Sequence, residues 1–358
     1  VYDLETTRLC LFPPMGVFPR PWPSWMVRYP RVVLAENALD MARLHYAAPA
    51  AAEEAMLTVF ETAPAPQVPC MYPNGNLNMV ARDGEPTGTS PAWCLPFHNL
   101  YGMYLRSLNR GWLERLYPYL VAFLDWWLAH RVDPEGWAVY KCTWEAGEDG
   151  NPRLDPEKSG DAVLVDRVRP VELQAAMAQS AAILARMARE LGRPAAEVVR
   201  WEEVYRRFTA LTRRLWDPAT GRFRDGDPRR GGFTEPQDEI GGRGSGFHPL
   251  SALALMYGVA EPGQARIFAR DLPRYLDTPA TDWPSWTFVL AEGAIAAGED
   301  AWAAELAWSV LSRVYPENDR RHLHPPRPLP GVARENWPRD LSRAGSEAYA
   351  WGANTAQL

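Results

Sequence analysis

The feature that most constrains this chain is a helical repeat of apolar residues in three long stretches. Residues 112–131, 171–191 and 195–215 each carry an apolar stripe whose members are three or four positions apart. In the first stretch the stripe consists of Leu113, Tyr117, Leu120, Leu124 and Trp127. This spacing places the apolar side chains on one face of an α-helix, while the opposite faces are rich in Arg and Glu. The chain is therefore predicted to be built mainly from helices that pack on a shared core.

Weaker patterns of the same kind predict eight further helices, which makes eleven in all. They cover residues 31–46, 51–62, 96–108, 248–257, 264–276, 286–297, 301–315 and 346–358. Short turns at residues 109–111, 192–194 and 298–300 would make consecutive helices antiparallel neighbours. No stretch shows the sustained alternation of a strand, and the best strand candidate is 222–224, after a turn rich in Asp, Pro and Gly.

Long segments without helical periodicity separate these helices. They are residues 10–30, 63–94, 133–168 and 316–342, with a shorter Gly-rich segment at 226–246. Loops of this length inside a compact domain usually carry function. We therefore expect one all-α catalytic domain over 1–358 whose loops build a pocket at one end. The Gly-rich segment follows no strand, so a mobile rim of the pocket is expected there rather than a nucleotide site.

Composition excludes several classes of protein. The 358 residues are 47% hydrophobic and 23% charged, with a formal net charge of −6 and no Lys/Arg run, which argues against nucleic acid and anionic membranes as partners. No apolar run reaches the length of a membrane span, and the first residues do not resemble a secretion signal, so a cytoplasmic location is predicted. The chain does not begin with Met, which leaves the native start open, and oligomeric state is not readable. The four cysteines lack metal-site spacing and are expected to be buried thiols.

The segment 142–155 (CTWEAGEDGNPRLD) is the first candidate for chemistry. It gathers Glu145, Glu148, Asp149 and Asp155 around Trp144, among turn residues. A carboxyl beside an indole can have its pKa raised by desolvation, which suits a general acid near neutral pH. On residue types alone, a solvated acidic turn or a calcium-like loop remains an alternative.

The second candidate is the segment 334–356 (RENWPRDLSRAGSEAYAWGANTA), with carboxyls at Glu335 and Glu347. Glu347 would start the last helix, where an acidic side chain complements the helix dipole. Glu335 lies outside any periodic pattern and has no such local explanation. Two carboxyl clusters far apart in the sequence suit a glycosidase, which must reach both sides of a glycosidic bond.

Four ordered motifs resemble glycoside hydrolase family 63, in its mannosylglycerate and glucosylglycerate hydrolase-like branch. WEAGEDGNPR at 144–153 resembles the family signature W-E-x-G-x-D-x-S-P-R. Residues 168–192 resemble the helix that follows this signature, and LWDPATGRFRD at 215–225 resembles a conserved turn of the family. Residues 334–354 resemble its closing loop and last helix, with ENWP where E-x-Y-N-P would stand. The likeness extends from about residue 91 to the end.

This resemblance implies an (α/α)6 toroid that hydrolyses an α-glycosidic bond with inversion. By motif match, Asp149 would be the general acid and Glu335 the general base, with no metal or cofactor. The substrate would be a small carbohydrate, either an α-glucoside or an α-mannoside such as a hexosyl-glycerate. The expected substrate contacts are Trp144, Glu145, Arg153, Trp25, Trp283, Trp286, Trp351, His98 and His248.

The sequence departs from the family pattern at two places. Asn151 replaces the Ser of the signature, and the early Trp-Asp pair, whose Asp binds the sugar in the family, is not evident because Trp25 is followed by Met26. The nearest acids, Glu36 and Asp40, fall inside a predicted helix. The subsite for the non-reducing sugar is therefore left without an assigned carboxyl.

Two other functions stay open on the sequence. A sugar epimerase or isomerase on a similar toroid would place histidines such as His98 and His248 at the cavity floor. A toroid that had lost its chemistry would bind carbohydrate through aromatic residues and direct its acids elsewhere. Convergence of Asp149 and Glu335 on one cavity would favour hydrolysis.

Overall fold

The computed structural model describes residues 2–149, 151–155, 160–234, 248–314, 323–324, 327–328, 333–338 and 345–356. Most of the predicted loop 316–342, and residues 235–246 of the Gly-rich segment, lie outside the described residues. The mobile rim expected in the Gly-rich segment 226–246 therefore stays a prediction, because most of that segment lies outside the described residues.

The three helices with the strongest apolar stripes are confirmed. They are α5 (Arg110–His130), α7 (Val171–Glu190) and α8 (Ala195–Arg214). The other α-helices are α1 (Tyr2–Leu9), α2 (Leu34–Leu44), α3 (Pro49–Thr62), α4 (Phe97–Ser107), α6 (Thr143–Ala146), α9 (Leu253–Met256), α10 (Pro262–Ala269), α11 (Pro284–Ala296) and α12 (Asp300–Val314). Short 3-10 helices are η1 (Ala92–Cys94), η2 (Pro249–Ala252), η3 (Leu272–Asp277), η4 (Pro279–Asp282) and η5 (Ala350–Ala356).

Several boundaries differ from the sequence predictions. The helix expected over 264–276 is broken into α10 and η3, because Pro273 cannot continue an α-helix. The helix expected to start at 346 begins only at Ala350 and is a 3-10 helix in the described residues. Helices α1 and α6 were not predicted, since eight and four residues are too short to show a full apolar period.

Strands are short throughout the described residues. The antiparallel pairs are β1 (Leu11–Phe12) with β2 (Trp22–Pro23), β3 (Trp216–Asp217) with β4 (Arg222–Phe223), and β5 (Leu323–His324) with β6 (Arg327–Pro328). The predicted strand at 222–224 is thus confirmed for its first two residues, in a hairpin with the segment before the turn.

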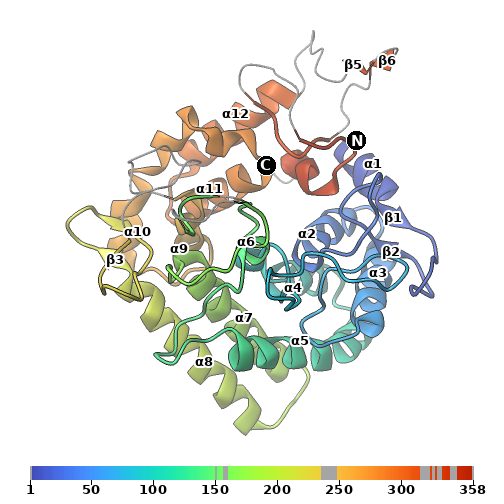
Figure 1. The fold of residues 1–358 in the computed structure, drawn as a ribbon, viewed down its shortest axis with the longest axis horizontal. Coiled ribbons are helices and arrows are strands. Elements are labelled where there is room, and N and C mark those ends of the chain that lie inside the picture. The colour runs from blue at the N-terminus through green and yellow to red at the C-terminus, as the bar shows by residue number, and fades with distance from the viewer. Residues whose placement is uncertain are drawn as a thin grey trace.

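Six helical elements form a closed inner ring. Going around it, α2 packs on α4, α4 on α7, α7 on α9, α9 on α11, α11 on η5, and η5 returns to α2 (Figure 1). Outside this ring α1 and α3 pack on α2, α5 and α8 pack on α7, and α12 packs on α11. The first and last elements, α1 and η5, lie side by side. The fold is therefore a mostly helical toroid.

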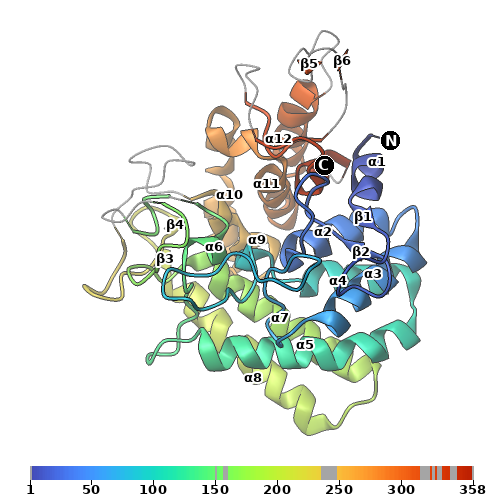
Figure 2. The same ribbon diagram turned by 45° about the vertical axis from the view of Figure 1, so that its right-hand side comes forward.

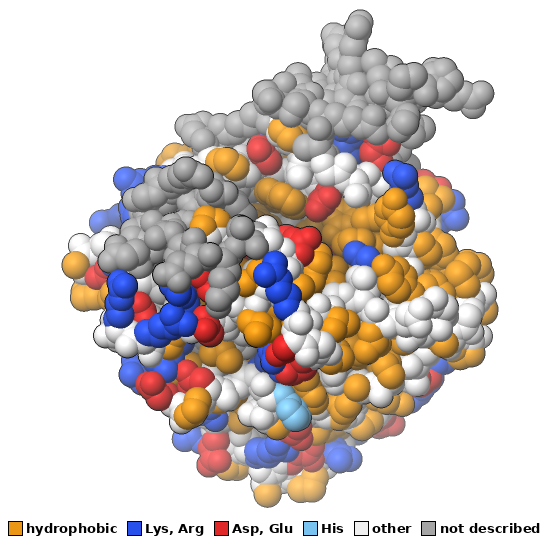
Figure 3. Space-filling view, in the orientation of Figure 1, with side chains coloured by type: hydrophobic (Ala, Val, Ile, Leu, Met, Phe, Trp, Pro, Cys, Tyr) orange, Lys and Arg blue, Asp and Glu red, His pale blue; other side chains and the backbone are white. Residues whose placement is uncertain are grey.

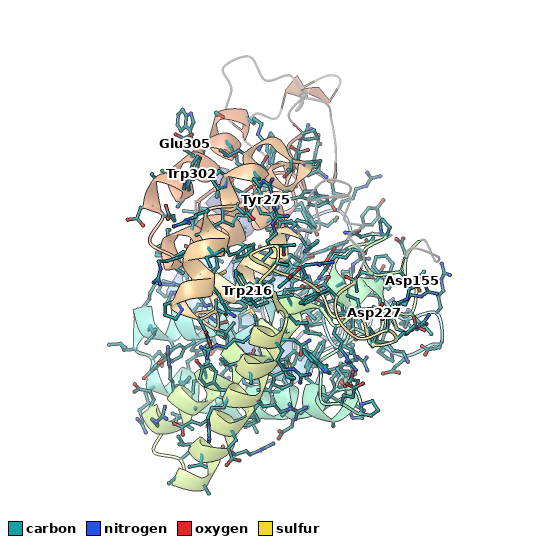
Figure 4. The ribbon with its side chains drawn as sticks, turned by 90° about the vertical axis from the view of Figure 1, so that its left-hand side faces the viewer. Asp155, Trp216, Asp227, Tyr275, Trp302 and Glu305 are labelled. Atoms are coloured by element: carbon teal, nitrogen blue, oxygen red, sulfur yellow. The ribbon has the colours of Figure 1, made fainter. Side chains whose placement is uncertain are left out.

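The loops gather on one side of this toroid. Figure 2, turned from the first view, shows α5 and α8 along one edge and α11 with α12 at the other. In the side view of Figure 4, Asp155 and Asp227 lie near each other in the loops, on the side away from Trp302 and Glu305 of α12. The loops after α6 and β4 therefore lie on the same side of the toroid.

The two ends of the chain close the ring by direct backbone pairing. Met26 and Tyr349 form an antiparallel bridge, and the N–H of Ala350 donates to the carbonyl of Trp25 at 3.0 Å. Gly352 is required for this closure, because a Cβ there would lie 1.5 Å from the carbonyl oxygen of Arg334. The N-terminal loop and the C-terminal segments 333–338 and 345–356 are therefore held together at the same end of the toroid.

The core contains the apolar faces predicted from the sequence. All five stripe residues of α5 are buried, and the four cysteines are buried free thiols, as expected. In the part of the chain that the structure describes, no helix is both long and apolar enough to cross a bilayer.

Candidate active site

A cavity of about 330 Å³ opens at the loop end of the toroid. Asp149 and Glu335, far apart in the sequence, both line it. Six tryptophans and one tyrosine form much of the remaining wall: Trp25, Trp93, Trp144, Trp283, Trp286, Tyr349 and Trp351. The face in Figure 3 shows a hollow with a largely apolar floor and acidic side chains at its edge. Aromatic faces beside carboxyls are the surface that a sugar ring requires, because its C–H face is apolar and its hydroxyls donate.

The acid-bearing loop is positioned by a single helical turn. Helix α6 ends at Gly147, which has a φ of +66° and cannot carry a side chain, since a Cβ there would lie 2.5 Å from the Cβ of Pro91. Glu145 anchors this turn from below: its carboxylate accepts the N–H groups of Gly88 (2.7 Å) and Lys141 (2.6 Å). The chain then turns outward and presents Asp149 to the cavity.

Asp149 lies at the accessible edge of the cavity and has a high proton affinity. Partial desolvation raises its pKa to about 7, and the negative charges of Asp161, Glu335 and Glu148 act in the same direction. The carboxyl is therefore half protonated near pH 7. Such a group can donate a proton at a pH where an ordinary aspartate is fully ionised.

Glu335 reaches the cavity from the loop that precedes η5. The bridge between Arg334 and Glu347 fixes the backbone on either side of it, and Arg334 pairs with the Glu347 carboxylate at 2.9 Å. The N–H of Ser346 donates to Oε2 of Glu335 at 3.1 Å. Desolvation raises the pKa of Glu335 from its usual value, and the Ser346 hydrogen bond opposes that rise by favouring the carboxylate. Glu335 therefore has a backbone donor in a fixed position, and this donor favours the ionised carboxylate.

A third carboxyl in the cavity, Glu36, was not assigned from the sequence. It projects from the first turn of α2 and is buried, and Tyr349 donates its hydroxyl to both carboxylate oxygens at 3.0 and 3.1 Å. Burial and the negative charges of Asp40 and Glu335 hold its pKa well above the usual range. Asp40, the other acid near the expected Trp-Asp position, pairs instead with Arg43 at 2.8 Å and does not line the cavity.

Arg31 is the one Lys or Arg among the described lining residues. Its guanidinium lies 3.7 Å from the ring of Trp25 and donates to the hydroxyl of Tyr72 at 3.1 Å. Its Nε is buried and has no hydrogen-bond partner in the described part of the chain. A guanidinium that stacks on an indole and has an unpaired, buried N–H can bind an anionic group of a ligand by donating to it.

Two predicted substrate contacts lie behind the cavity wall. Arg153 is buried and pairs with Glu148 (2.5 Å), Glu172 (2.6 Å) and Asp225 (2.7 Å). Glu145 pairs with Arg131 at 2.8 Å in addition to its backbone bonds. Neither Glu145 nor Arg153 is among the residues that line the cavity. The structure therefore places them where they support the acid loop rather than where they would touch a sugar directly.

The two predicted histidines do not meet at the cavity. His248 lies outside the lining and pairs with Glu148 at 2.9 Å, with its ring 5.5 Å from that of Trp286. His98 lines a different hollow, beside α4 and α7. The arrangement that an epimerase would need, with this histidine pair at the floor, is not what the described residues form.

The five tryptophans predicted as substrate contacts lie around one cavity. Trp144, Trp283, Trp286, Trp351 and Trp25 all line the cavity. Trp283 and Trp286 are stacked with ring centroids 6.2 Å apart, and Trp351 meets Trp93 edge-on at 5.6 Å. The walls are therefore pre-packed against one another, which limits the entropy lost when a ligand is bound.

Comparison with known proteins decides the family. The family model of the mannosylglycerate hydrolase MGH1-like glycoside hydrolase domain matches residues 35–276. The chain belongs to this family. The resemblance drawn from the sequence motifs is thereby confirmed, including its mannosylglycerate hydrolase-like branch. No curated protein matches the chain in a sequence search.

Solved structures resemble this MGH1-like chain over nearly its whole length. A glycoside hydrolase family 63 mannosylglycerate hydrolase from Thermus thermophilus, in complex with glucose, has a TM-score of 0.73 at 18% identity, covering 99% of this chain and 98% of that one. The same enzyme with Tris and D-glycerate gives a TM-score of 0.71 at 17% identity, with the same coverage. Neutral trehalase Nth1 from Saccharomyces cerevisiae has a TM-score of 0.61 at 13% identity, covering 94% of this chain and 73% of that one. At these identities the likeness establishes the fold.

Three cavity residues of this MGH1-like chain escaped sequence reasoning for different reasons. Glu36 lies in a helix whose every residue is buried, so no polar face marks it. Arg31 was expected at the start of the helix predicted over 31–46, whereas α2 begins only at Leu34 and leaves Arg31 in the loop before it. Tyr349 reaches Glu36 only because the chain ends pair. The sequence did carry one signal for Glu36, because this carboxyl stands among apolar residues in VVLAENAL. An acidic side chain is rarely buried unless it is paired with another group or has a function.

Proposed function

We propose that the chain is an inverting α-glycosidase, a single catalytic domain built as an (α/α)6 toroid, that hydrolyses small α-glucosides or α-mannosides such as hexosyl-glycerates. The observation that carries this proposal is the convergence of Asp149 and Glu335 on one aromatic-lined cavity. Family membership supports a glycosidase, and the two carboxyls supply the groups that such a reaction uses.

In the proposed reaction Asp149 is the general acid. With a pKa of about 7 it is substantially protonated near neutrality and can protonate the leaving glycosidic oxygen. Glu335, oriented by the Ser346 N–H, takes a proton from the attacking water. Inversion requires the two carboxyls to be roughly 6.5–9.5 Å apart, so that a water fits between the base and the sugar.

The third carboxyl would bind the sugar rather than react. Glu36 is already engaged with the Tyr349 hydroxyl, and it lies on the inner helix α2, next to the aromatic wall. It therefore supplies the acidic ligand that the missing early Trp-Asp pair had left unassigned.

Arg31 favours an aglycone that carries a carboxylate. It is a cation in a cavity lined by Glu36, Glu148, Asp149 and Glu335, and an anionic aglycone would satisfy its unused N–H. The mannosylglycerate hydrolase from Thermus thermophilus was solved with D-glycerate, which is such a carboxylate. We expect Arg31→Met to lower kcat/KM about 10–100-fold for a hexosyl-glycerate, the value of a charged hydrogen bond, and far less for the matching methyl hexoside.

The roles of the two acids are separable by choice of leaving group. Purified protein would be assayed on a panel of α-glucosides and α-mannosides, including the α-glycosyl fluoride of the preferred sugar. Because fluoride needs little help from an acid, Asp149→Asn should retain fluoride hydrolysis while losing O-glycoside hydrolysis. Glu335→Gln should lose both. Wild-type turnover of O-glycosides by both variants would refute the assignment, and sugar binding without any turnover in the wild type would favour a binding-only toroid.

A further inference from the structure

Two further hollows are lined by residues of α4 and, among the described residues, share no lining residue with the catalytic cavity. One has a volume of about 590 Å³ and the other about 270 Å³, and both are lined by His98 and Gly102. Trp93 itself lines the catalytic cavity, while its carbonyl accepts the hydroxyl of Tyr257, which lines the larger hollow, at 3.3 Å. We call the two together the rear hollow, defined by His98, Gly102, Gln179, Tyr257 and Glu292.

The rear hollow contains a histidine with one fixed tautomer. The amide nitrogen of Gln179 can only donate, so Nδ1 of His98, 2.8 Å away, accepts its hydrogen bond. Burial lowers the pKa of His98 to about 4, which keeps the ring neutral near pH 7. Its proton is therefore on Nε2, and that N–H has no hydrogen-bond partner among the residues that the structure describes. A donor of defined position is left for a ligand.

The rear hollow also contains a hydrogen-bond acceptor, the carboxylate of Glu292. Glu292, on α11, is partly buried and makes no hydrogen bond or ion pair with any described residue. Desolvation raises its pKa, which reflects the absence of a compensating partner. A carboxylate in such a place accepts hydrogen bonds from hydroxyl groups and repels an anion.

Apolar rings complete the walls. Tyr101 and Tyr257 are buried and line the larger hollow, and Phe288 lines the smaller one beside Glu292. The three described arginines that line the hollow are engaged or peripheral: Arg106 donates to the Ala42 carbonyl and to His45, Arg189 pairs with Glu202, and Arg186 is exposed. A neutral polyol fits this set, since its hydroxyls would meet His98 and Glu292 while its C–H groups lie on the rings.

Gly102 lines both parts of the rear hollow. It lies inside α4, where glycine costs about 0.5–1 kcal/mol relative to alanine. Its φ is not positive, and an added Cβ would meet only the Arg106 guanidinium, at 3.6 Å. Neither the backbone nor the packing requires glycine here. Because Gly102 has no side chain, space stays open in both hollows.

We propose that the rear hollow is a second binding site, which takes a neutral polyol of monosaccharide size. It is distinct from the catalytic cavity, which it adjoins through Trp93 and Tyr257. It would hold the ligand between the His98 N–H and the Glu292 carboxylate, against the aromatic walls.

Equilibrium dialysis with labelled D-glucose and D-mannose tests this site. We expect two bound hexoses per wild-type chain and one in Gly102→Leu, whose side chain would extend into the rear hollow. Gly102→Ala should fold at least as stably as wild type, which controls for the helix. Gly263→Leu is the matched control, because it lies in another helix with no atom within 4 Å of an added Cβ, and it should still bind two.

Glu292→Gln keeps the proposal testable should Gly102→Leu not fold. This substitution preserves shape and should weaken the second hexose at least tenfold, while hydrolysis at the catalytic cavity is retained. Hydrogen exchange should show sugar-dependent protection in α4 and α11. A single hexose per wild-type chain, two in folded Gly102→Leu, unchanged affinity in Glu292→Gln, or a preference of this site for D-glycerate over hexose would each overturn the proposal.

Discussion

Glu148 and Asp149 are adjacent in the chain, but their surroundings shift the pKa values of the two carboxyls in opposite directions. Glu148 is fully buried but contacts Arg153 at 2.5 Å and His248 at 2.9 Å, and these partners lower its pKa despite the desolvation that opposes them. Asp149 is more accessible, but its partial desolvation and its negative neighbours outweigh the positive charge of Arg31, so its pKa is raised to about 7. Pairing, more than burial, decides which carboxyl keeps a proton. One acidic segment thereby holds both a paired structural anion and the carboxyl that we propose as the proton donor.

The largest expected effect is on catalysis. Asp149→Asn should lower kcat on O-glycosides about 10²–10⁴-fold, the usual contribution of a general acid, without a comparable change in substrate affinity. Steady-state kinetics with binding measured separately would check this. Asp161→Asn is the matched control at a pH well below the pKa of Asp149, because Asp161 is an exposed neighbour outside the cavity lining, and there it should keep kcat within a few fold.

The next effect is on the stability of the fold, and it concerns the ion pairs that hold Glu148. Arg153→Met leaves Glu148, Glu172 and Asp225 buried without their shared cation, and should cost about 3–5 kcal/mol in the free energy of unfolding. Arg31→Met removes an arginine that has no ion pair among the described residues and should cost far less. Urea unfolding of the two variants would compare them, and equal losses would contradict the role given to pairing.

A smaller effect should appear in the pH dependence of hydrolysis. The proposed mechanism uses protonated Asp149, so kcat/KM should fall as pH rises through about 7, and it uses ionised Glu335, so kcat/KM should also fall at acidic pH. Asp161→Asn removes one of the charges that raise the pKa of Asp149, and should move the alkaline limb to lower pH. An alkaline limb that does not move would show that Asp161 has no influence on the acid.

The smallest effect is a difference in thermal stability. Because the pKa of Asp149 is raised in the folded state, ionisation opposes folding, and this penalty grows as pH rises from about 4 to above 7. The Tm of Asp149→Asn relative to wild type should therefore increase between pH 4 and pH 8. Glu148→Gln should show the reverse trend, since a lowered pKa stabilises the fold at higher pH.

The sequence predicted those parts that depend on local pattern. The apolar stripes of α5, α7 and α8 were sufficient to locate these helices, and the motif at 144–153 led to Asp149. Glu335 was found because no local helix position explained it. In each case the information lay within about twenty neighbouring residues.

What the sequence did not reveal depends on contacts between distant segments. Glu36 joins the cavity because the bridge of Met26 with Tyr349 brings the chain ends together. Glu145 and Arg153 matched the motif, yet their charges are used by partners on other segments, such as Arg131 and Glu172. His98 lies in the rear hollow because of how α4 packs on α7. A motif specifies residue types, but only the fold determines whether their side chains line the cavity or lie behind its lining.

The most direct test of this account is a titration of the two neighbouring carboxyls. Protein labelled with ¹³C at the side-chain carboxyls of Asp and Glu would be followed by NMR from pH 3 to pH 9, with Asp149→Asn and Glu148→Gln to assign the signals. We expect Asp149 to titrate near pH 7 and Glu148 to titrate below its usual value of 4.5. An Asp149 signal that titrates with the ordinary aspartates, near pH 4, would contradict this expectation.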